Sequence, residues 1–340
     1  MSHGLTQMMS EKSRAPSAHV PFDAKVGIKI SPRIAGTGSY APDQVMTNDE
    51  LAKRVKTNSD WIEKNLGIRQ RRIAPKGMLT SDLATRAGAR ALEQAGLNAA
   101  ELDLIILATA TPDRKAPSTA CFVQRDLGAV RAAAFDMNAV CSGFLYAMTV
   151  ANQFIRSGEM RHILVIGADT FSTITDWNRR DCVFFGDGAG AVVLSRSEDP
   201  AGFFSSKIYA DGKGHDNFTV LPEDRFFTMN GRAVYETGTV VLPAAIQTIL
   251  KENSLTVDNI DWIVPHQPSI VILKKTAEIL GVPFDKVCTN MDRYANTSSA
   301  TIPLMLDEAN RAGRFKKRDI IVFAAVGSGW TWGAAIYRWL

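Results

Sequence analysis

The stretch AGLNAAELDLIILATATPD, residues 95–113, has a counterpart later in the chain, NSLTVDNIDWIVPHQPS at residues 253–269. Asp103 aligns with Asp261, and Leu and Ile residues on either side of this pair align at the same offset of 158 residues. In both copies a short apolar run follows the aspartate, which is typical of a strand buried on both faces. A repeat with so long a period predicts two similar halves related by pseudo-symmetry, not a solenoid.

Helical and strand-like patterns alternate around this repeat. Apolar periodicity predicts helices over residues 81–97 and 145–158, the first ending at Gly96 and the second at Gly158, and a buried strand over 161–169. Such alternation is typical of an α/β protein whose sheets are covered on both faces.

The repeat also suggests how the chain is divided. We place the boundary between the halves near residues 197–203, where SEDPAGF breaks the pattern. This gives a mobile N-terminal tail over residues 1–26, an N-terminal half over 27–200 and a C-terminal half over 201–340.

Composition limits the function classes. The 340 residues are 46% hydrophobic and 22% charged, which is ordinary for a globular protein, and a formal net charge of +4 does not argue for a nucleic-acid partner. No apolar run approaches the roughly 18–20 residues that cross a bilayer. Four scattered cysteines show no metal-ligand spacing. We therefore expect a cytoplasmic protein with reduced thiols, no membrane partner, no metal and no resident cofactor.

Cys141 is the first candidate for chemistry. It stands in AFDMNAVCSGFLYAM, residues 134–148, among small residues and directly before a predicted helix. Unpaired N–H groups at a helix start lower a thiol pKa from about 8.5 toward roughly 5–7, so we expect a thiolate nucleophile at neutral pH. The alternative is a small buried hydrophobe, which is our interpretation of Cys121, Cys182 and Cys288.

His266 and Asn296 are the partners that the repeat suggests. His266 directly follows the second buried strand, and Asn296 precedes the segment that aligns with the helix at Cys141. Functional groups of open α/β sheets gather at the carboxyl ends of strands, so the three side chains are expected to converge where the halves meet. A neutral His and an amide aimed at one oxygen stabilise the enolate that forms when a malonyl group loses carbon dioxide. A structural His and a turn-forming Asn are the alternatives.

Two glycine-rich stretches, FGDGAGA and VGSGWTWG, lack the order of a phosphate-binding loop, and each runs directly into a strand-like segment. Glycines there indicate close backbone approach. Backbone N–H groups near Ser328 are candidates for an oxyanion hole.

Several motifs in the same order resemble the β-ketoacyl-acyl carrier protein synthase III group of the thiolase superfamily over roughly residues 27–340. They are SDWIEKNLGIRQRRIA, DMNAVCSGFLYAM, FFGDGAGAVVL, VPHQPS, YANTSSATIP and GSGWTWGAAIYRW. The resemblance implies a thiolase-like five-layer αβαβα fold, usually a homodimer. It implies an enzyme that takes an acyl primer from coenzyme A onto Cys141 and condenses it with malonyl-acyl carrier protein, initiating fatty acid synthesis by ping-pong kinetics. His266 and Asn296 then assist decarboxylation.

The resemblance also implies binding residues. Trp61 and Arg180 match positions that sandwich the adenine of coenzyme A, an arrangement that suits a flat ring. Met229, Gly231 and Tyr235 match positions that line the pantetheine tunnel.

The chain departs from the family pattern at several positions. Asn65, Glu236 and Val271 replace cations that the family has near phosphates or the acidic carrier protein, and Ser269 replaces an Asn after the histidine. The absence of one charge-assisted hydrogen bond costs roughly 1.5–3 kcal/mol. Lys274 and Lys275, or FKKR at residues 315–318, are candidates for a substitute basic face toward the carrier protein, and a solvated helix face explains them equally well.

Other members of the superfamily fit less well. A degradative thiolase needs a second cysteine near the C-terminus, which VGSGWTWG does not offer, and a hydroxymethylglutaryl-CoA synthase needs a glutamate near the nucleophile. The remaining alternatives are a specialised synthase of secondary metabolism with a different primer or acceptor, and a non-catalytic subunit of a heteromeric synthase. The second is disfavoured because all three candidate catalytic residues are present.

Overall fold

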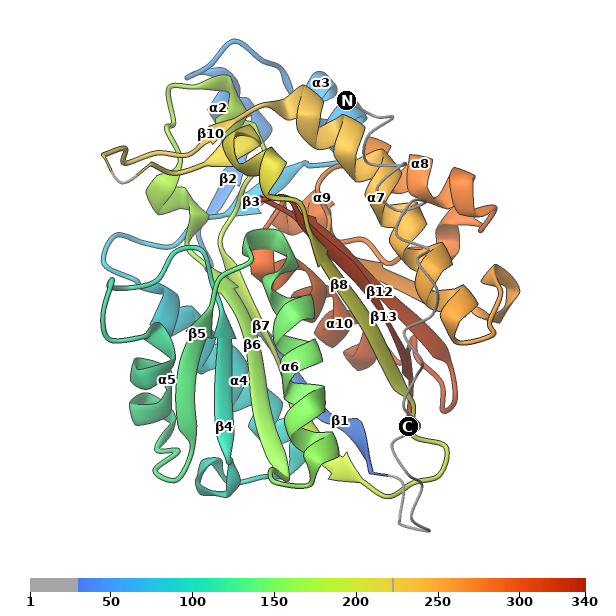
Figure 1. Cartoon of the computed structure of the whole chain (residues 1–340). Helices are drawn as coiled ribbons and strands as arrows, with labels where there is room; N and C mark the ends of the chain where they lie inside the picture. Colours follow the sequence, from blue (N-terminus) through green and yellow to red (C-terminus); the bar gives the residue numbers. More distant parts are fainter. Residues whose placement is uncertain (1–29, 222) are drawn as a thin grey trace.

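The computed structural model describes residues 30–221 and 223–340, so the tail predicted over residues 1–26 lies outside the described residues. Two sheets form the centre of the molecule (Figure 1). The first has five strands in the order β1 (Ser31–Tyr40), β7 (Gly188–Ser197), β6 (His162–Asp169), β4 (Leu104–Ala108) and β5 (Ala133–Met137). The second has four in the order β8 (Phe204–Ala210), β13 (Thr331–Arg338), β12 (Ile320–Gly327) and β11 (Trp262–Pro265).

The two sheets repeat one topology. In each, a parallel pair is followed by two antiparallel pairings: β4–β6, β6–β7 and β7–β1 in the first sheet, and β11–β12, β12–β13 and β13–β8 in the second. The aligned aspartates make equivalent hydrogen bonds. The Asp103 carboxylate accepts from the backbone N–H of His162 at the start of β6, and the Asp261 carboxylate accepts from the backbone N–H of Ile320 at the start of β12. The predicted pair of similar α/β halves is therefore confirmed.

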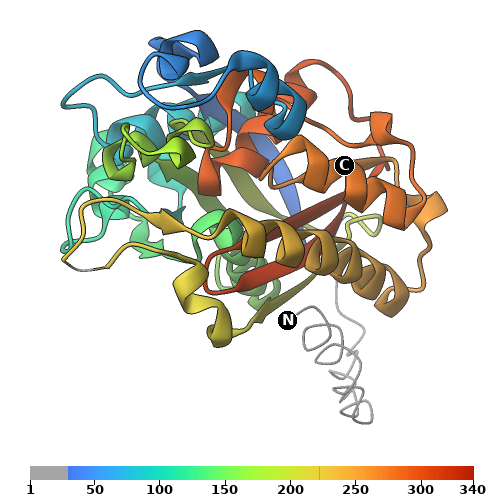
Figure 2. The same ribbon diagram turned by 90° about the horizontal axis from the view of Figure 1, so that it is seen from above.

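Helices separate and cover the two sheets in five alternating layers (Figures 1 and 2). α4 (Thr80–Ala95) and α5 (Thr119–Leu127) cover the outer face of the first sheet. α6 (Gly143–Ser157) and α10 (Thr301–Arg311) lie between the sheets. α7 (Gly231–Glu252) and α8 (Ile270–Leu280) cover the outer face of the second sheet. The predicted helix ends at Gly96 and Gly158 are confirmed, with φ values of 65° and 83° that favour glycine.

Shorter elements frame one end of this assembly. They are β2 (Val45–Thr47), α2 (Asn48–Ala52), α3 (Ser59–Leu66), β3 (Gln70–Arg72), β9 (Phe218–Thr219), β10 (Thr228–Met229) and α9 (Met291–Tyr294). Between β7 and β8 the chain crosses from the first sheet to the second. The division at residues 200 and 201 stays a prediction.

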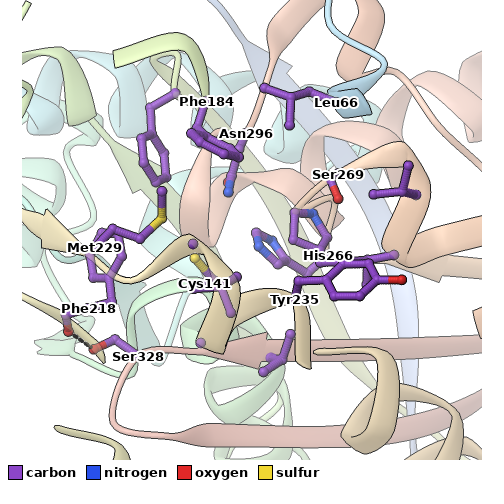
Figure 3. A pocket seen from close by; sticks show the side chains of 18 of the residues that line it. Leu66, Cys141, Phe184, Phe218, Met229, Tyr235, His266, Ser269, Asn296 and Ser328 are labelled. Carbon is purple, nitrogen blue, oxygen red and sulfur yellow. Dashed lines mark hydrogen bonds between the residues drawn. The ribbon is translucent and has the colours of Figure 1, made fainter. Parts of the chain in front are cut away.

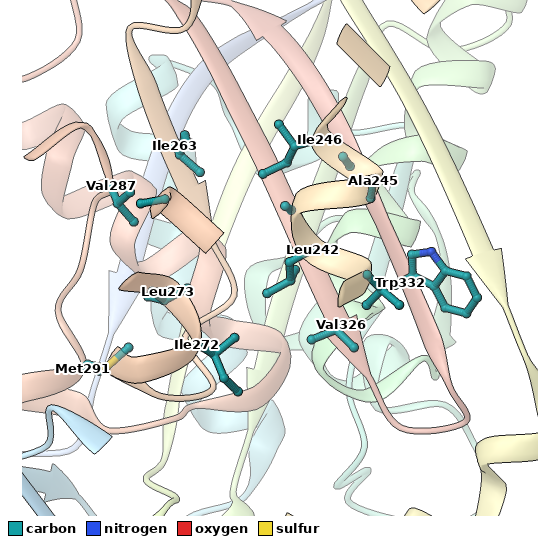
Figure 4. Packing of buried hydrophobic residues seen from close by; sticks show 14 of the residues in the cluster. Leu242, Ala245, Ile246, Ile263, Ile272, Leu273, Val287, Met291, Val326 and Trp332 are labelled. Atoms are coloured by element: carbon teal, nitrogen blue, oxygen red, sulfur yellow. The ribbon is translucent and has the colours of Figure 1, made fainter. Parts of the chain in front are cut away.

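α7 is the one helix of the described residues whose length and apolar composition match a membrane span. Half of its apolar window is buried, and its side chains, Leu242 and Ile246 among them, pack with Val326 of β12 and Trp332 of β13 (Figure 4). Its apolar face is thus accounted for by packing on the second sheet.

Candidate active site

Two short 3₁₀ turns meet in the middle of the molecule. η2 (Val140–Ser142) leads into α6, and η8 (Ser298–Ala300) leads into α10, 158 residues later. Each turn begins at a residue with positive φ, 46° for Val140 and 53° for Ser298. η2 packs on β12 of the second sheet, η8 packs on β6 of the first, and the turns contact each other. The repeat therefore brings equivalent helix starts from both halves to one place.

Cys141 is the middle residue of η2. Its Sγ lies 3.8 Å from the Ser298 Oγ of the other turn. Gly327, the last residue of β12, approaches the backbone of η2 so closely that a Cβ there would lie 2.9 Å from the Ala139 carbonyl oxygen. The position before a helix is as predicted, but the lowered thiol pKa is not. Burial raises the pKa of Cys141 to about 12, so the resting group is a thiol.

His266 directly follows β11 and is buried. Its backbone N–H donates to the Ala324 carbonyl at 2.8 Å, which continues the pairing of β11 with β12. The Oε1 of the neighbouring Gln267 accepts from the backbone N–H groups of Asn290 and Met291 and fixes this corner. Burial lowers the pKa of His266 to about 3, against a hydrogen bond with the backbone of Ser298, so the imidazole is neutral at pH 7.

Asn296 is held by the first half of the chain. Its backbone N–H donates to the Phe184 carbonyl, and its own carbonyl accepts from the N–H of Gly186. Its Oδ1 accepts from the Ser298 N–H at 2.8 Å. This contact fixes the side chain so that the amide nitrogen faces the same space as His266 and Cys141 (Figure 3).

These three side chains line one pocket, whose empty space including its open mouth is about 890 Å³ (Figure 3). Its entrance lies at α3 and the start of α7, where Tyr235 is 45% exposed. Its inner wall is apolar: Phe185 and Phe218 line it and pack with the buried Phe171 and Phe227 behind them. A pocket with an open polar entrance and a closed apolar end suits a long thioester substrate.

The predicted binding residues divide into two groups. Trp61, Met229, Gly231, Tyr235 and Ser269 line the pocket. Arg180 does not line it, but its guanidinium lies 4.3 Å from the centre of the Trp61 ring at the entrance.

The residues of the predicted basic face do not line the pocket. Lys274 and Lys275 lie on α8 outside the pocket lining, and Lys275 pairs with Glu278 at 2.8 Å. FKKR at residues 315–318 precedes β12, whereas the pocket lies beyond the other end of that strand. This segment therefore lies away from the pocket entrance, and its role in a basic face toward the carrier protein stays a prediction.

Two sequence profiles of one family match this chain. The C-terminal profile of 3-oxoacyl-[acyl-carrier-protein (ACP)] synthase III matches residues 250–339, and a second profile of the same synthase matches residues 135–212. The β-ketoacyl-[acyl-carrier-protein] synthase III of Laribacter hongkongensis is 46% identical over 316 residues, covering 90% of this chain and 99% of the relative. The chain belongs to the β-ketoacyl-[acyl-carrier-protein] synthase III family. The synthase III of Ehrlichia canis is 47% identical over 313 residues, with 90% and 98% covered.

A solved synthase III shares the fold. The crystal structure of 3-oxoacyl-[acyl-carrier-protein] synthase III from Aquifex aeolicus VF5 matches with a TM-score of 0.88 and 41% identity, over 91% of this chain and all of that one. The predictions of the synthase III family and of its thiolase-like five-layer fold are confirmed.

The departures from the synthase III pattern gather at the entrance. Asn65 and Val271 line it, and the Asn65 amide donates to the Trp61 carbonyl at 2.8 Å. Glu236 pairs with Arg232 at 2.8 Å on α7. The described residues that line the pocket include no Lys or Arg.

Some sequence-based interpretations of single residues need correction or refinement. Cys121 lies exposed on α5, because α5 turns this position to solvent, so its interpretation as a buried hydrophobe is wrong, whereas Cys182 and Cys288 are buried as expected. The Ser328 side chain lines the pocket, and its Oγ donates to the Phe218 carbonyl. The two glycine-rich stretches do run into strands, β7 and β13.

Sequence reasoning missed two residues. Ser298 contacts the sulfur of Cys141. Asp169, at the end of β6, is fully buried and accepts hydrogen bonds from Thr109, Ala110, Thr111 and Ser299. An aspartate at the end of an apolar strand was the available signal for Asp169, whereas the contact of Ser298 depends on the meeting of two distant turns.

Proposed function

We propose that this protein transfers an acyl primer from coenzyme A to Cys141 and condenses it with malonyl-acyl carrier protein, giving a 3-oxoacyl-acyl carrier protein that initiates fatty acid synthesis. The observation that carries the proposal is the convergence of Cys141, His266 and Asn296 on one pocket in a chain of the synthase III family.

The first half-reaction forms a thioester on Cys141. The sulfur attacks the acyl carbonyl of acyl-coenzyme A, the bond from carbon to the coenzyme sulfur breaks, and the thiol proton of Cys141 leaves with the coenzyme A thiolate. Because the resting group is a thiol, proton loss accompanies attack. A backbone N–H near Ser328 is proposed to donate to the carbonyl oxygen in this step.

The second half-reaction forms the new carbon–carbon bond. The malonyl carboxylate leaves as carbon dioxide, and its electron pair forms an enolate of the remaining thioester. The neutral His266 and the Asn296 amide donate to the enolate oxygen. The enolate carbon attacks the acyl carbon on Cys141, and the sulfur leaves and recovers a proton.

The entrance is proposed to hold the long parts of both substrates. Trp61 and Arg180 offer a stacking site for the adenine of coenzyme A. Met229, Gly231, Tyr235 and Ser269 line the path of the pantetheine arm. Lys274 and Lys275 on α8 are the proposed contacts for the acidic carrier protein, with the enzyme acting as a cytoplasmic homodimer that needs no metal or resident cofactor.

Labelling with radioactive acetyl-coenzyme A tests the proposal. We expect label on the wild-type protein, none on Cys141→Ala, and transfer of the label to product when malonyl-acyl carrier protein is added. Label that survives Cys141→Ala contradicts the assigned nucleophile. Absence of condensation with malonyl-acyl carrier protein for every primer tried contradicts the proposed role in fatty acid initiation.

A further inference from the structure

We propose that Ser298 is a further catalytic residue, whose hydroxyl donates a hydrogen bond to the Cys141 sulfur and stabilises the thiolate as the acyl group transfers. The inference rests on the proposed function, because it takes Cys141 as the acylated nucleophile. In the resting site the Cys141 thiol donates to Ser298 Oγ at 3.8 Å, and Ser298 is 1% exposed. Once the thiol proton has left, the sulfur becomes an acceptor, and the Ser298 hydroxyl turns to donate to it.

The surroundings of Cys141 create the need for this donor. Burial disfavours the thiolate, and the Asp169 carboxylate at the end of β6 acts in the same direction. His266, on the neighbouring second sheet, is neutral and supplies no charge. The described residues lining the pocket include no Lys or Arg. Among the described residues, the side chain within hydrogen-bond distance of the Cys141 sulfur is that of Ser298, which acts beside the N-terminus of α6.

Hydrogen bonds on both sides fix the backbone of Ser298 and so position its hydroxyl. The Ser298 N–H donates to Asn296 Oδ1 at 2.8 Å, and its carbonyl accepts from Thr301 Oγ1 at 2.8 Å. The next residue, Ser299, donates through its Oγ to Asp169 at 2.6 Å. This fixed geometry explains why a non-glycine residue remains at a φ of 53°, a conformation that persists only where the surroundings determine it.

A side-chain substitution isolates the hydroxyl. Ser298→Ala keeps the backbone N–H that orients Asn296 and removes the hydroxyl, which contacts both the Cys141 sulfur and the Asp169 carboxylate. Ser298→Gly removes the same donor and is compatible with the positive φ, so it preserves the turn if alanine disturbs it. Ser142→Ala is the matched control: Ser142 adjoins Cys141 and is buried, but its hydroxyl donates to the Thr331 carbonyl.

The test measures the rate of iodoacetamide alkylation of Cys141 at pH 8, with the modified peptide identified by mass spectrometry. A hydrogen bond to a charged group is worth about one pKa unit or more, and well below the pKa the alkylation rate follows the thiolate fraction. We therefore expect both Ser298 variants to alkylate roughly tenfold more slowly and to slow single-turnover acylation from acetyl-coenzyme A roughly tenfold at pH 7, whereas Ser142→Ala leaves the alkylation rate unchanged.

An unchanged or faster alkylation rate in both folded Ser298 variants overturns the inference. Equal slowing in the Ser298 variants and in Ser142→Ala also overturns it, because it indicates a general disturbance of the turn. Failure of the proposed function has a different signature, namely a wild-type Cys141 that alkylates normally but accepts no acyl group from any primer.

Discussion

The two turns η2 and η8 occupy equivalent places in the two halves, but they are anchored in opposite ways. η8 is tied to the first sheet by Asp169, whose carboxylate accepts from both the N–H and the Oγ of Ser299. The equivalent residue at the end of β12 is Gly327, which lies against the backbone of η2 without any side chain. A charged anchor thus fixes the turn that supports Cys141, whereas glycine keeps a carboxylate away from η2, the turn that carries the sulfur.

The residues just before β7 and β13 differ between the two halves in the same way. Asp187, just before β7, is buried and accepts from Ala74 and Ser172. Trp330 precedes β13 at the corresponding corner of the second sheet. The buried carboxylates of these corners therefore belong to the first half, and the second half leaves room for substrate beside Cys141.

Making the second half like the first is expected to have the largest effect. In Gly327→Asp, the new Cβ would lie 2.9 Å from the Ala139 carbonyl oxygen and 2.9 Å from the Ser142 nitrogen, so η2 must shift. We expect complete loss of acylation and a lower Tm, measured by acyl labelling and calorimetry. Gly212→Asp, at an open position without a positive φ, is a control for the added charge. An acylated Gly327→Asp protein would show that η2 does not need a bare glycine beside it.

Removing the enolate donors is expected to affect one half-reaction. His266→Ala or Asn296→Ala should reduce condensation about 10²–10³-fold, the usual cost of one such donor, because the enolate oxygen loses a hydrogen bond. Acylation of Cys141 by acetyl-coenzyme A should continue. The readout is product formation beside single-turnover labelling. Equal losses of rate in acylation and condensation would contradict the assignment of His266 and Asn296 to the condensation step.

The buried carboxylates predict a pH dependence of stability. Burial raises the pKa of Asp187 from 3.8 to about 6, so the folded state holds this proton more tightly than the unfolded state does. Its contribution is therefore full below pH 4 and is lost as pH rises to about 6, by roughly 3 kcal/mol. The free energy of unfolding, measured with urea at several pH values, should fall with rising pH more steeply for wild type than for Asp187→Asn. Parallel pH profiles would contradict the buried state of Asp187.

Restoring a cation at the entrance is expected to have the smallest effect. The first half supplies Arg180 there, whereas the second half supplies Val271 and Glu236. Val271→Arg should lower KM for coenzyme A thioesters or malonyl-acyl carrier protein a few-fold and increase its salt dependence, with kcat nearly unchanged. Val271→Gln controls for side-chain size. A KM that is the same for Arg and Gln would show that charge at this position does not matter.

The sequence alone predicted the parts of the site that depend on pattern. The local pattern placed Cys141 at a helix start, and the repeat placed His266 at a strand end and Asn296 before the segment that aligns with the Cys141 helix. The family motifs added Trp61. It did not predict the raised pKa of Cys141, because burial of the sulfur depends on packing between the two turns. The Ser298 contact was missed for the same reason: it joins residues 157 positions apart, and no local pattern reports such a pair.

Peptide mapping of the intact enzyme after incubation with acetyl-coenzyme A alone is the decisive experiment for Cys141 as the nucleophile. We predict one acetyl group, carried by Cys141 in η2, and none on the exposed Cys121 or on the buried Cys182 and Cys288. We also predict that this group disappears when malonyl-acyl carrier protein is added. An acetyl group on any other residue, or an unmodified Cys141, would refute the assignment.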